Sequence, residues 1–353
     1  MDKYITDGGG TIYRIPLNEF PGLVGNCYFV IVDKYRILID TGSGFGESNQ
    51  DLESGLKNVS EIRGEDCSLK KLSHVFITHG HIDHYGGLPF VKDQTEAKIC
   101  IHELDSMIVS NHRERLSIAA HRLEEFLSEA GVLADQRTDL LEMYKFTKSM
   151  FRSVNVDLTY EAMGMKLGPF NFIHVPGHCA GHVMILLHDV LFSGDHILER
   201  TSPHQAPEQI TLSTGLDTYL KSLEDIRPLA RVMKITLGGH EDPVLDLDKR
   251  INEIRSIHFE RLQQVLDFLS KTHTITDLSK HLFGNVGGYT KLLALEETGA
   301  HVEYLYQRGF LEIVNIKDIE DNPKLGPIRY QSVKRTIGNI LNNEVKEDFH
   351  VFI

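Results

Sequence analysis

Seven side chains of metal-binding type follow one another along this chain in a compact pattern. They are His79, His81, Asp83, His84, His178, Asp195 and His240. Imidazole nitrogens and carboxylate oxygens are common zinc ligands, and three protein ligands for each ion leave a coordination position for water. Two such ions side by side ionise a shared water molecule near neutral pH. The pattern therefore predicts a two-metal hydrolytic centre that uses zinc.

The first cation site is expected around the first two histidines. His79 and His81 lie two positions apart on a segment that we expect to be extended, so their side chains point to the same side. His178, which follows Pro176-Gly177, is expected to complete this site. Three imidazoles would then hold one cation.

The second cation site draws on the other four side chains. Asp83 and His84 follow in the same loop, and His240 comes after Gly238-Gly239. Asp195 is the natural bridge between the two cations. We assign a direct catalytic role to Asp83 in addition to its role as a ligand.

A framework of strands must deliver these ligands. Apolar and β-branched runs predict strands at 26–32, 36–40, 72–77, 98–101, 170–175, 183–187, 190–192 and 232–237. Helical spacing of apolar residues predicts helices near 50–56, 117–127, 140–150 and 216–225. The first ligand segment directly follows the strand at 72–77, in the loop before a helix, where α/β sheets usually carry their active sites.

Two regions depart from this alternation of strands and loops. Amphipathic helices at about 103–153 are predicted to form an insertion, which either packs against the rest of the protein, the favoured alternative, or covers the metal cleft with apolar side chains. Beyond residue 250, three helices and a strand have the outline of a winged-helix-like module; they are expected at 251–269, 276–283, 290–308 and 310–314. We therefore predict a catalytic domain over 1–250 and a C-terminal domain over 251–353.

The ligand pattern also resembles that of a known family. The segment His79–His84 resembles the H-x-H-x-D-H motif of the metallo-β-lactamase superfamily. The remaining ligand positions of that family are matched in order by His178, Asp195 and His240. The likeness covers about residues 10–250 and implies an α/β fold, a four-layer αββα sandwich with the metals at one edge. It also implies zinc, with iron or manganese in some members.

Finer matches point to a branch of that superfamily. The segment Pro176–His182 resembles the P-G-H-T-x-G-H loop of glyoxalase II-like thioesterases, with Cys179 at the usual Thr position. Ser193–Leu198 and the helices around His258 and Arg261 are more similar to a subgroup with acyl-carrier-protein thioesterases and an endoribonuclease. The resemblance implies cleavage of a thioester or related acyl ester, of acyl-CoA, acyl-carrier or acyl-glutathione type. The alternative is a metal-dependent endoribonuclease for single strands; lactonase and β-lactamase activity rank lower.

Four residues near the ligands have weaker claims. In the superfamily the position of Asp40 forms hydrogen bonds to the ligand shell, which implies that Asp40 orients the ligands. His182 either touches substrate, and it is named here as a catalytic candidate, or packs as a buried histidine. His196 has the same two alternatives. His204, in a proline-rich loop, either lines the pocket or, as the favoured alternative, lies at the surface.

Composition limits the partners. The chain of 353 residues has a net charge of −13, and residues 257–353 hold 11 Lys+Arg against 13 Asp+Glu, so a nucleic-acid partner is not expected. The four cysteines form no C-x-x-C pair and are expected to be reduced. The absence of a secretory signal or a membrane-length apolar run predicts a cytoplasmic protein that does not bind membranes. A small acyl substrate is the expected partner, and the C-terminal module is a candidate for homodimer formation.

Overall fold

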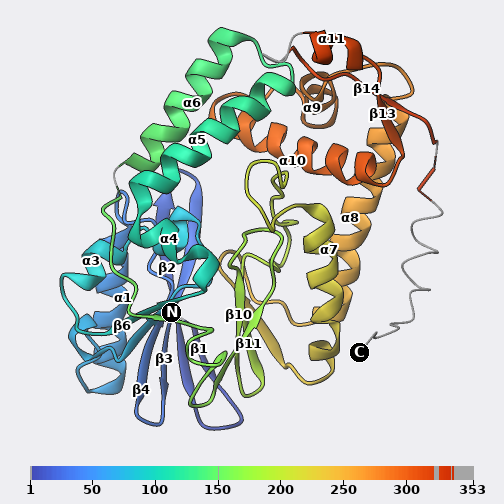
Figure 1. The fold of residues 1–353 in the computed structure, drawn as a ribbon. Helices are drawn as coiled ribbons and strands as arrows, with labels where there is room; N and C mark the ends of the chain where they lie inside the picture. The colour runs from blue at the N-terminus through green and yellow to red at the C-terminus, as the bar shows by residue number, and fades with distance from the viewer. Residues whose placement is uncertain (1, 150, 322–325, 335, 338–353) are drawn as a thin grey trace.

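The protein consists of two β-sheets stacked face to face, with helices on their outer faces (Figure 1). The structure is a computed structural model that describes residues 2–149, 151–321, 326–334 and 336–337. Met150, at the end of a predicted helix, and residues 338–353 of the predicted C-terminal domain lie outside the described residues. The layered arrangement confirms the predicted αββα sandwich.

The first sheet has seven strands in chain order. They are β1 (Asp2–Ile5), β2 (Thr11–Phe20), β3 (Leu23–Val32), β4 (Tyr35–Ile39), β5 (His74–Phe76), β6 (Lys98–Ile101) and β7 (Leu158–Thr159). Strands β1 to β4 pair antiparallel, whereas β4, β5, β6 and β7 are parallel. The carboxyl ends of β4, β5 and β6 therefore meet at one edge of the sheet. The segments that follow these three strands begin at Asp40, Ile77 and His102.

The second sheet supplies the other ligands at the ends of its strands. Its order is β12 (Ile235–Gly238), β11 (Val190–Gly194), β10 (Val183–Leu187), β9 (Phe170–His174) and β8 (Lys166–Leu167). His178 lies in the loop between β9 and β10, Asp195 directly follows β11, and His240 follows β12. Because β11 and β12 are parallel, Asp195 and His240 emerge at the same edge.

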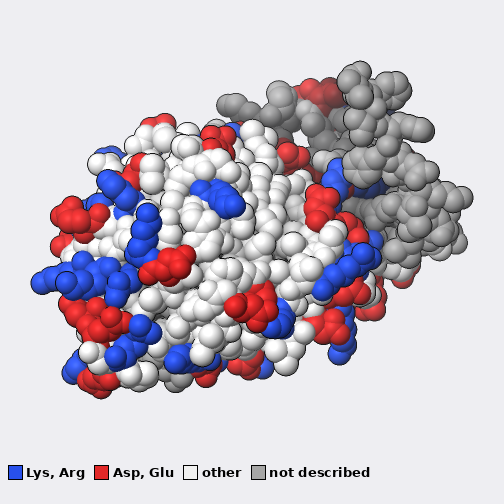
Figure 2. All heavy atoms as spheres, turned by 90° about the horizontal axis from the view of Figure 1, so that it is seen from below, with Lys and Arg blue, Asp and Glu red and all other residues white. Residues whose placement is uncertain are grey.

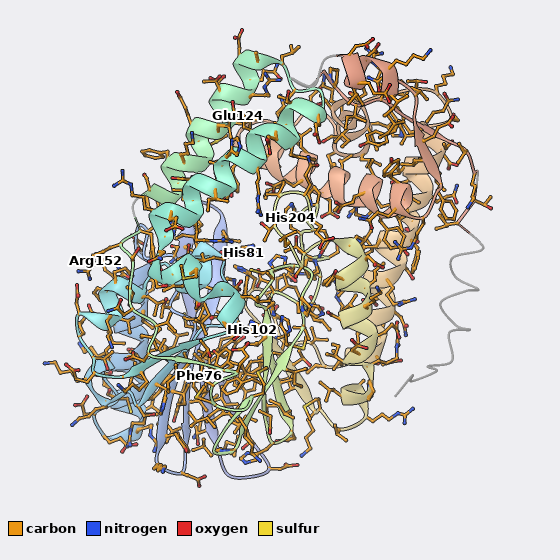
Figure 3. The ribbon with its side chains drawn as sticks, in the orientation of Figure 1. Phe76, His81, His102, Glu124, Arg152 and His204 are labelled. Carbon is orange, nitrogen blue, oxygen red and sulfur yellow. The ribbon has the colours of Figure 1, made fainter. Side chains whose placement is uncertain are left out.

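Aromatic rings fill the space between the sheets. Phe76 of β5 packs edge-on against Phe170 and Phe172 of β9, with ring centroids 5.3 and 5.1 Å apart. Figure 3 shows Phe76 between the two sheets, below the ligand loops. Burial of such large apolar side chains is the main force that holds the sheets together.

The helices cover the outer faces and connect the sandwich to the C-terminal part. They are α1 (Ser48–Arg63), α2 (Ile82–Tyr85), α3 (Leu88–Lys92), α4 (Glu103–Ser110), α5 (His112–Glu129), α6 (Ala134–Ser149), α7 (Leu216–Asp225), α8 (Leu247–Phe268), α9 (Ile275–Phe283), α10 (Gly288–Gln307) and α11 (Ile316–Asp321), with short 3₁₀ turns at Leu69–Lys71 and Arg227–Arg231. β13 (Leu311–Ile313) and β14 (Tyr330–Ser332) form a separate two-stranded sheet. Three helices followed by a strand are the predicted outline of the C-terminal module. The second strand, β14, was not predicted.

The helical insertion packs against the C-terminal helices. Phe126 of α5 belongs to the same buried cluster as Tyr219 of α7, Leu262 of α8 and Leu295 of α10. A Cβ atom at Gly299 of α10 would lie 2.7 Å from the ring of Phe126, so this contact needs glycine. In Figure 1 the α5–α6 pair rises from the sandwich and meets α9 and α10. One continuous core thus joins the three parts, and the predicted domain boundary at residue 250 falls inside α8.

One predicted strand is shorter than expected. The apolar run at 232–237 becomes a strand only from Ile235, because the 3₁₀ turn over Arg227–Arg231 ends immediately before it. Val232 is accordingly 63% exposed. Within the described residues, none of the helices combines the length and the apolar character needed to cross a membrane.

Candidate metal centre

The seven predicted ligands converge into two adjacent clusters. The first contains His79, His81 and His178, and the second contains Asp83, His84, Asp195 and His240. Within each cluster the candidate ligand atoms lie within 4.8 Å of one another. Asp195 Oδ2 is also 3.8 Å from His178 Nε2, which places its carboxylate between the clusters, at the position predicted for the bridge.

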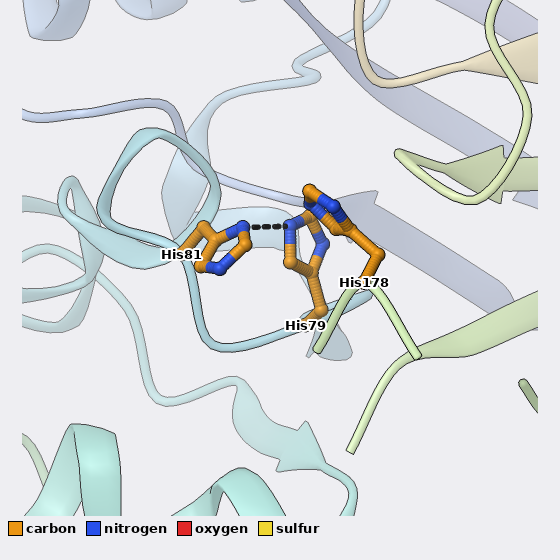
Figure 4. Close-up of side chains that lie close together, drawn as sticks. All are labelled: His79, His81 and His178. Carbon is orange, nitrogen blue, oxygen red and sulfur yellow. Dashed lines mark hydrogen bonds between the residues drawn. The ribbon is translucent and has the colours of Figure 1, made fainter. Parts of the chain in front are cut away.

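The first cluster brings three imidazole rings together from two loops (Figure 4). His79 Nε2 lies 3.0 Å from His81 Nδ1, and Figure 4 shows the ring of His178 beside that of His79. The ring centroids of His81 and His178 are 4.5 Å apart. The atoms facing the shared space are therefore His79 Nε2, His81 Nδ1 and His178 Nε2.

The second cluster mixes imidazoles with carboxylates. His240 Nε2 is 3.4 Å from Asp83 Oδ2 and 3.5 Å from Asp195 Oδ2. His84 Nε2 is 3.4 Å from Asp195 Oδ1 and 4.0 Å from Asp83 Oδ2. This pattern of nitrogen and oxygen atoms around one point is typical of a zinc or other transition-metal site.

The other ring nitrogen of three ligands is held by a hydrogen bond. His84 Nδ1 donates to Asp40 Oδ2 at 2.9 Å, His178 Nδ1 donates to a backbone carbonyl at 2.7 Å, and His240 Nδ1 donates to the carbonyl of Val24 at 2.9 Å. Each bond leaves Nε2 as the ring nitrogen that faces the cluster, which is the arrangement of known metal-bound histidines.

The polar atoms of the centre also fit a pair of cations. Among the described residues, His84 Nε2, His178 Nε2 and Asp195 Oδ1 are buried and form no hydrogen bond. Buried polar atoms of this kind are costly unless something satisfies them. Cations bound between the clusters would satisfy all three.

Two of the candidate ligands, His79 and Asp195, are in the charge state that binds a cation. Burial lowers the pKa of His79 well below its ordinary value, so this ring is neutral and its lone pair is available. Burial raises the pKa of Asp195, but the positive charges of His240 and His84 outweigh it and lower the pKa well below the ordinary value. The carboxylate is therefore ionised and ready to bind a metal.

Asp40 has the contacts that the family resemblance implies. Its Oδ1 accepts a hydrogen bond from the backbone N–H of Thr78 and its Oδ2 accepts from the Thr78 hydroxyl, both at 2.8 Å. The same Oδ2 accepts from His84. Asp40 adopts a left-handed backbone conformation, with φ of 60°, at the point where the chain leaves β4. The residue thus ties the β5 loop to a ligand ring.

The two histidines named as uncertain lie behind the ligands. His182 is fully buried, its Nε2 accepts a hydrogen bond from the backbone N–H of Asp195 at 3.1 Å, and its ring stacks on that of His79 with centroids 4.6 Å apart. Its catalytic role stays a prediction, because the contacts that the structure shows are with ligand residues. His196 is also fully buried, with its ring 4.8 Å from that of Tyr219.

His204 is more closely connected to the centre than the sequence suggested. Its carbonyl oxygen is the acceptor for His178 Nδ1, and its own Nε2 donates to the carbonyl of Leu293 on α10 at 3.1 Å. The side chain of His204 is 27% exposed, so it lies partly at the surface, but its peptide also supports a ligand of the centre. Figure 3 shows His204 above His81, on the side toward α10.

Asp105, at the start of α4, is a supporting residue that sequence reasoning missed. Its carboxylate accepts hydrogen bonds from the backbone N–H groups of Gly80 at 2.7 Å and Gly181 at 2.9 Å. The thiol of Cys179 also donates to it, with Sγ and Oδ2 3.2 Å apart. One buried carboxylate thus joins the two ligand loops, and Cys179 supplies a donor where the related loop has Thr. Within an amphipathic helix, Asp105 carried no signal of this role.

Glu19, at the end of β2, is a second buried carboxyl group that was missed. Its side chain lies against Gly25, where an added Cβ would be 2.1 Å from Glu19 Oε1. Among the described residues its Oε2 is a buried atom without a hydrogen bond. Burial, followed by the negative charge of Asp83, raises the pKa of Glu19 to about 9. The carboxyl group is therefore protonated at neutral pH when no metal is bound.

Replacing this residue by the neutral isostere in Glu19→Gln is expected to change the pH dependence of stability in the metal-free protein. The folded chain retains the Glu19 proton up to about pH 9, whereas the unfolded chain releases it near the ordinary pKa of 4.5. The free energy of unfolding of the wild type should therefore fall with rising pH across this window, more steeply than that of the variant by up to about 1.4 kcal/mol per pH unit. Urea unfolding with a chelator present, between pH 5.5 and 8.5, measures the difference; parallel curves would contradict it.

Comparison with known proteins places the chain in a family. Residues 20–231 match the family described as the metallo-beta-lactamase superfamily, and this chain belongs to it. The matched segment contains six of the seven ligands, and His240 follows it.

Two individual relatives each share 25% sequence identity with this chain. "Lactamase-like protein adaB" of Aspergillus niger is 25% identical over 251 residues, which are 70% of this chain but 59% of that protein. This chain therefore spans about three fifths of the length of that relative. "Atrochrysone carboxyl ACP thioesterase" of Claviceps purpurea is 25% identical over 280 residues, 76% of this chain and 70% of that protein. A crystal structure of a metallo-beta-lactamase family protein from Thermus thermophilus superposes with a TM-score of 0.71 at 24% identity, covering 91% of this chain and 98% of that one, and so shares the fold.

Proposed function

We propose that this chain is a metal-dependent hydrolase that cleaves a thioester or a related acyl ester at a two-metal centre. The observation that carries the proposal is the meeting of the two ligand clusters at Asp195. Cations bound at these positions would supply a hydroxide at neutral pH and polarise the carbonyl oxygen of the substrate. Zinc is the metal we propose, with iron or manganese as alternatives.

The exposure of the ligands indicates where a substrate enters. Five of the seven ligands are buried, whereas His81 and Asp83 are partly exposed. The open side of the centre is therefore the side of the loop after β5. Burial raises the pKa of Asp83, but the hydrogen bond from His240 outweighs it and lowers the pKa below its ordinary value. Asp83 is therefore an ionised carboxylate that could accept a hydrogen bond from a water molecule beside the reacting group, which supports the catalytic role predicted for it.

Apolar side chains lie beside this centre. The tip of the β2–β3 hairpin exposes Leu23 and Val24, the latter by 50%, and the carbonyl of Val24 is the acceptor for the His240 ring. Phe45, which is 44% exposed, stacks on Phe20 with ring centroids 5.7 Å apart. An apolar acyl group would be stabilised by burying such side chains.

The leaving group also favours a thioester. A thiolate departs without a proton, so the reaction needs no strong general acid. Glu19, whose carboxyl group is protonated in the metal-free protein, lies close to the second cluster, but it is only 2% exposed and does not reach a substrate. The fungal relative named as an ACP thioesterase supports the same substrate class.

Cleavage of single-stranded RNA is less well supported. A nuclease needs lysine and arginine side chains for phosphate contacts, and the chain carries a net charge of −13. Figure 2 shows the end of the sandwich away from the ligand loops, and there too basic and acidic side chains are interspersed. RNA is therefore included in the substrate screen as an alternative substrate class, together with a lactone and a β-lactam.

A substrate screen tests the proposal. Acyl-CoA, acyl-glutathione and acyl-carrier thioesters are compared with a lactone, a β-lactam and single-stranded RNA, using protein loaded with zinc, iron or manganese. We expect the highest kcat/KM for a thioester, at least roughly tenfold above the other classes, and its loss in His81→Ala. Thioester hydrolysis that is absent, or that persists at full rate in His81→Ala, would refute the proposal. A homodimer and a cytoplasmic location stay predictions.

A further inference from the structure

A short loop connects the first metal cluster to the C-terminal helices. His178, the last ligand of that cluster, donates from Nδ1 to the carbonyl oxygen of His204 at 2.7 Å. This hydrogen bond is what directs Nε2 of His178 toward the other ligands. The position of the His204 peptide therefore decides where the imidazole of His178 points.

The loop is in turn attached to α10 by two consecutive residues. The ring of His204 donates to the carbonyl of Leu293 at 3.1 Å. The backbone N–H of Gln205 donates to Glu297 Oε2 at 2.7 Å. Both Gln205 and the Glu297 side chain are buried, so water does not compete with this charge-assisted bond.

Glu297 is held in place from α8. The guanidinium of Arg261 donates to Glu297 Oε1, the oxygen that does not face the loop. Burial raises the pKa of Glu297 to about 7, and the charge of Arg261 opposes this rise. One carboxylate thus accepts from a guanidinium on one side and from a loop amide on the other.

Two buried histidines beside Glu297 raise the question of a third metal site. His258 Nδ1 lies 3.2 Å from His301 Nε2, and His301 Nδ1 donates to the Glu297 carbonyl at 2.7 Å. With Glu297 they form a group close enough to hold a cation. However, both carboxylate oxygens are already engaged and the positive charge of Arg261 is in contact with one of them. The cluster therefore acts as a rigid support for the carboxylate and not as a metal site.

We propose that Arg261 and Glu297 are positioning residues for the metal ligand His178, acting through the His204–Gln205 loop. The C-terminal helices thereby complete the cluster of His79, His81 and His178. The inference rests on the metal centre of the proposed function but not on the identity of its substrate. It assigns the C-terminal part of the chain a role in metal binding, in contrast to a role in packing alone.

The test is metal binding by Glu297→Gln. The neutral amide has one acceptor oxygen, so it cannot replace the carboxylate as the acceptor of hydrogen bonds from both Arg261 and the Gln205 N–H. The His204–Gln205 loop therefore loses its fixed position. We expect the affinity of the first cluster for Zn²⁺ or Co²⁺ to fall by roughly 10–100-fold, while the second cluster keeps its affinity. Competition with a chromophoric chelator measures the two affinities, and no enzymatic activity enters the readout.

The Co²⁺ absorption spectrum identifies which cluster is affected. At limiting metal, the spectrum of Glu297→Gln should match that of His178→Ala, which lacks a ligand of the first cluster, and differ from that of Asp83→Ala, which lacks a ligand of the second. Arg261→Lys keeps the charge but not the planar fork of donors, and should weaken the same cluster to a smaller degree. This variant preserves the test if Glu297→Gln does not fold.

Glu303→Gln is a matched control. Glu303 also lies on α10 and also accepts a hydrogen bond from the segment after β11, from the backbone N–H of Glu208 at 2.9 Å, which is four residues beyond the His204 peptide. Glu303→Gln should bind a cation at each of the two clusters with wild-type affinity. Unchanged affinities in Glu297→Gln and Arg261→Lys, or an equal loss at both clusters, would overturn the inference. A substrate screen without thioester turnover would remove the proposed function and leave this result standing.

Discussion

Replacing Asp195 by alanine is expected to lower kcat/KM for the preferred substrate by at least roughly 10³-fold. Among the described residues, Asp195 is the only candidate ligand that lies within ion-pair distance of both clusters. Its carboxylate oxygens are 3.8 Å from His178 Nε2 in the first cluster and 3.4 Å from His84 Nε2 in the second. Its removal would take away an oxygen that could bind a cation at either cluster, and it leaves the buried imidazoles without their counter-charge. Binding of the second cation should fail together with hydrolysis.

Metal content and steady-state kinetics measure this effect together. The wild type is expected to bind two cations per chain and Asp195→Ala one or fewer, by elemental analysis after dialysis. Asp242→Ala is the matched control, because Asp242 is an exposed aspartate that pairs with Arg14 at 3.4 Å. Its activity should stay within about twofold of the wild type. Two tightly bound cations and more than a tenth of the activity in Asp195→Ala would show that the carboxylate does not bridge.

The second large effect is expected in Asp105→Ala, and it concerns stability. The substitution leaves the buried N–H groups of Gly80 and Gly181 without their acceptor, and each unsatisfied group costs about 1–3 kcal/mol. Removal of a buried carboxylate offsets part of this loss. We therefore expect the free energy of unfolding to fall by roughly 2–4 kcal/mol, with weaker metal binding because both ligand loops lose their common attachment.

Chemical denaturation of the metal-free proteins separates this effect from metal binding. Cys179→Ser keeps a donor within reach of the same carboxylate oxygen and should change the free energy of unfolding by less than about 1 kcal/mol. Asp93→Ala removes an exposed aspartate that pairs with Arg152 and should be nearly neutral. If Asp105→Ala unfolds at the wild-type denaturant concentration, the carboxylate does not join the two loops.

Much of the framework could be predicted because its signals are local. Apolar runs such as 183–187 and 98–101 form strands at those positions, since an alternating or fully buried apolar segment has few other ways to satisfy its backbone. The helix predicted at 216–225 has these bounds in the structure. Predictions were less accurate where a turn competed with a strand, as at Val232, or where a strand at the edge of a sheet has little apolar character, as in β14.

The support of the metal centre could not be predicted in the same way. Asp105 meets Cys179 across 74 positions of sequence, and Gln205 meets Glu297 across 92. An aspartate in an amphipathic helix or a glutamate in a helix of mixed composition is usually solvated, so residue type alone favours the wrong environment. His204 was expected at the surface because it lies in a proline-rich loop. Its contact with the metal centre is made by its backbone carbonyl, which residue type does not reveal.

The amino-acid sequence by itself determined the set of candidate ligands, their order and their division into two groups. It could do so because metal coordination requires particular side chains and the strand–loop pattern around them is short-range. The tertiary structure alone decided which groups hold those ligands in position: the carboxylates of Asp105 and Glu297, the carbonyls of Val24 and His204, and the shared core of insertion and C-terminal helices. These contacts depend on how distant segments pack, and packing leaves no periodic or local trace in the sequence.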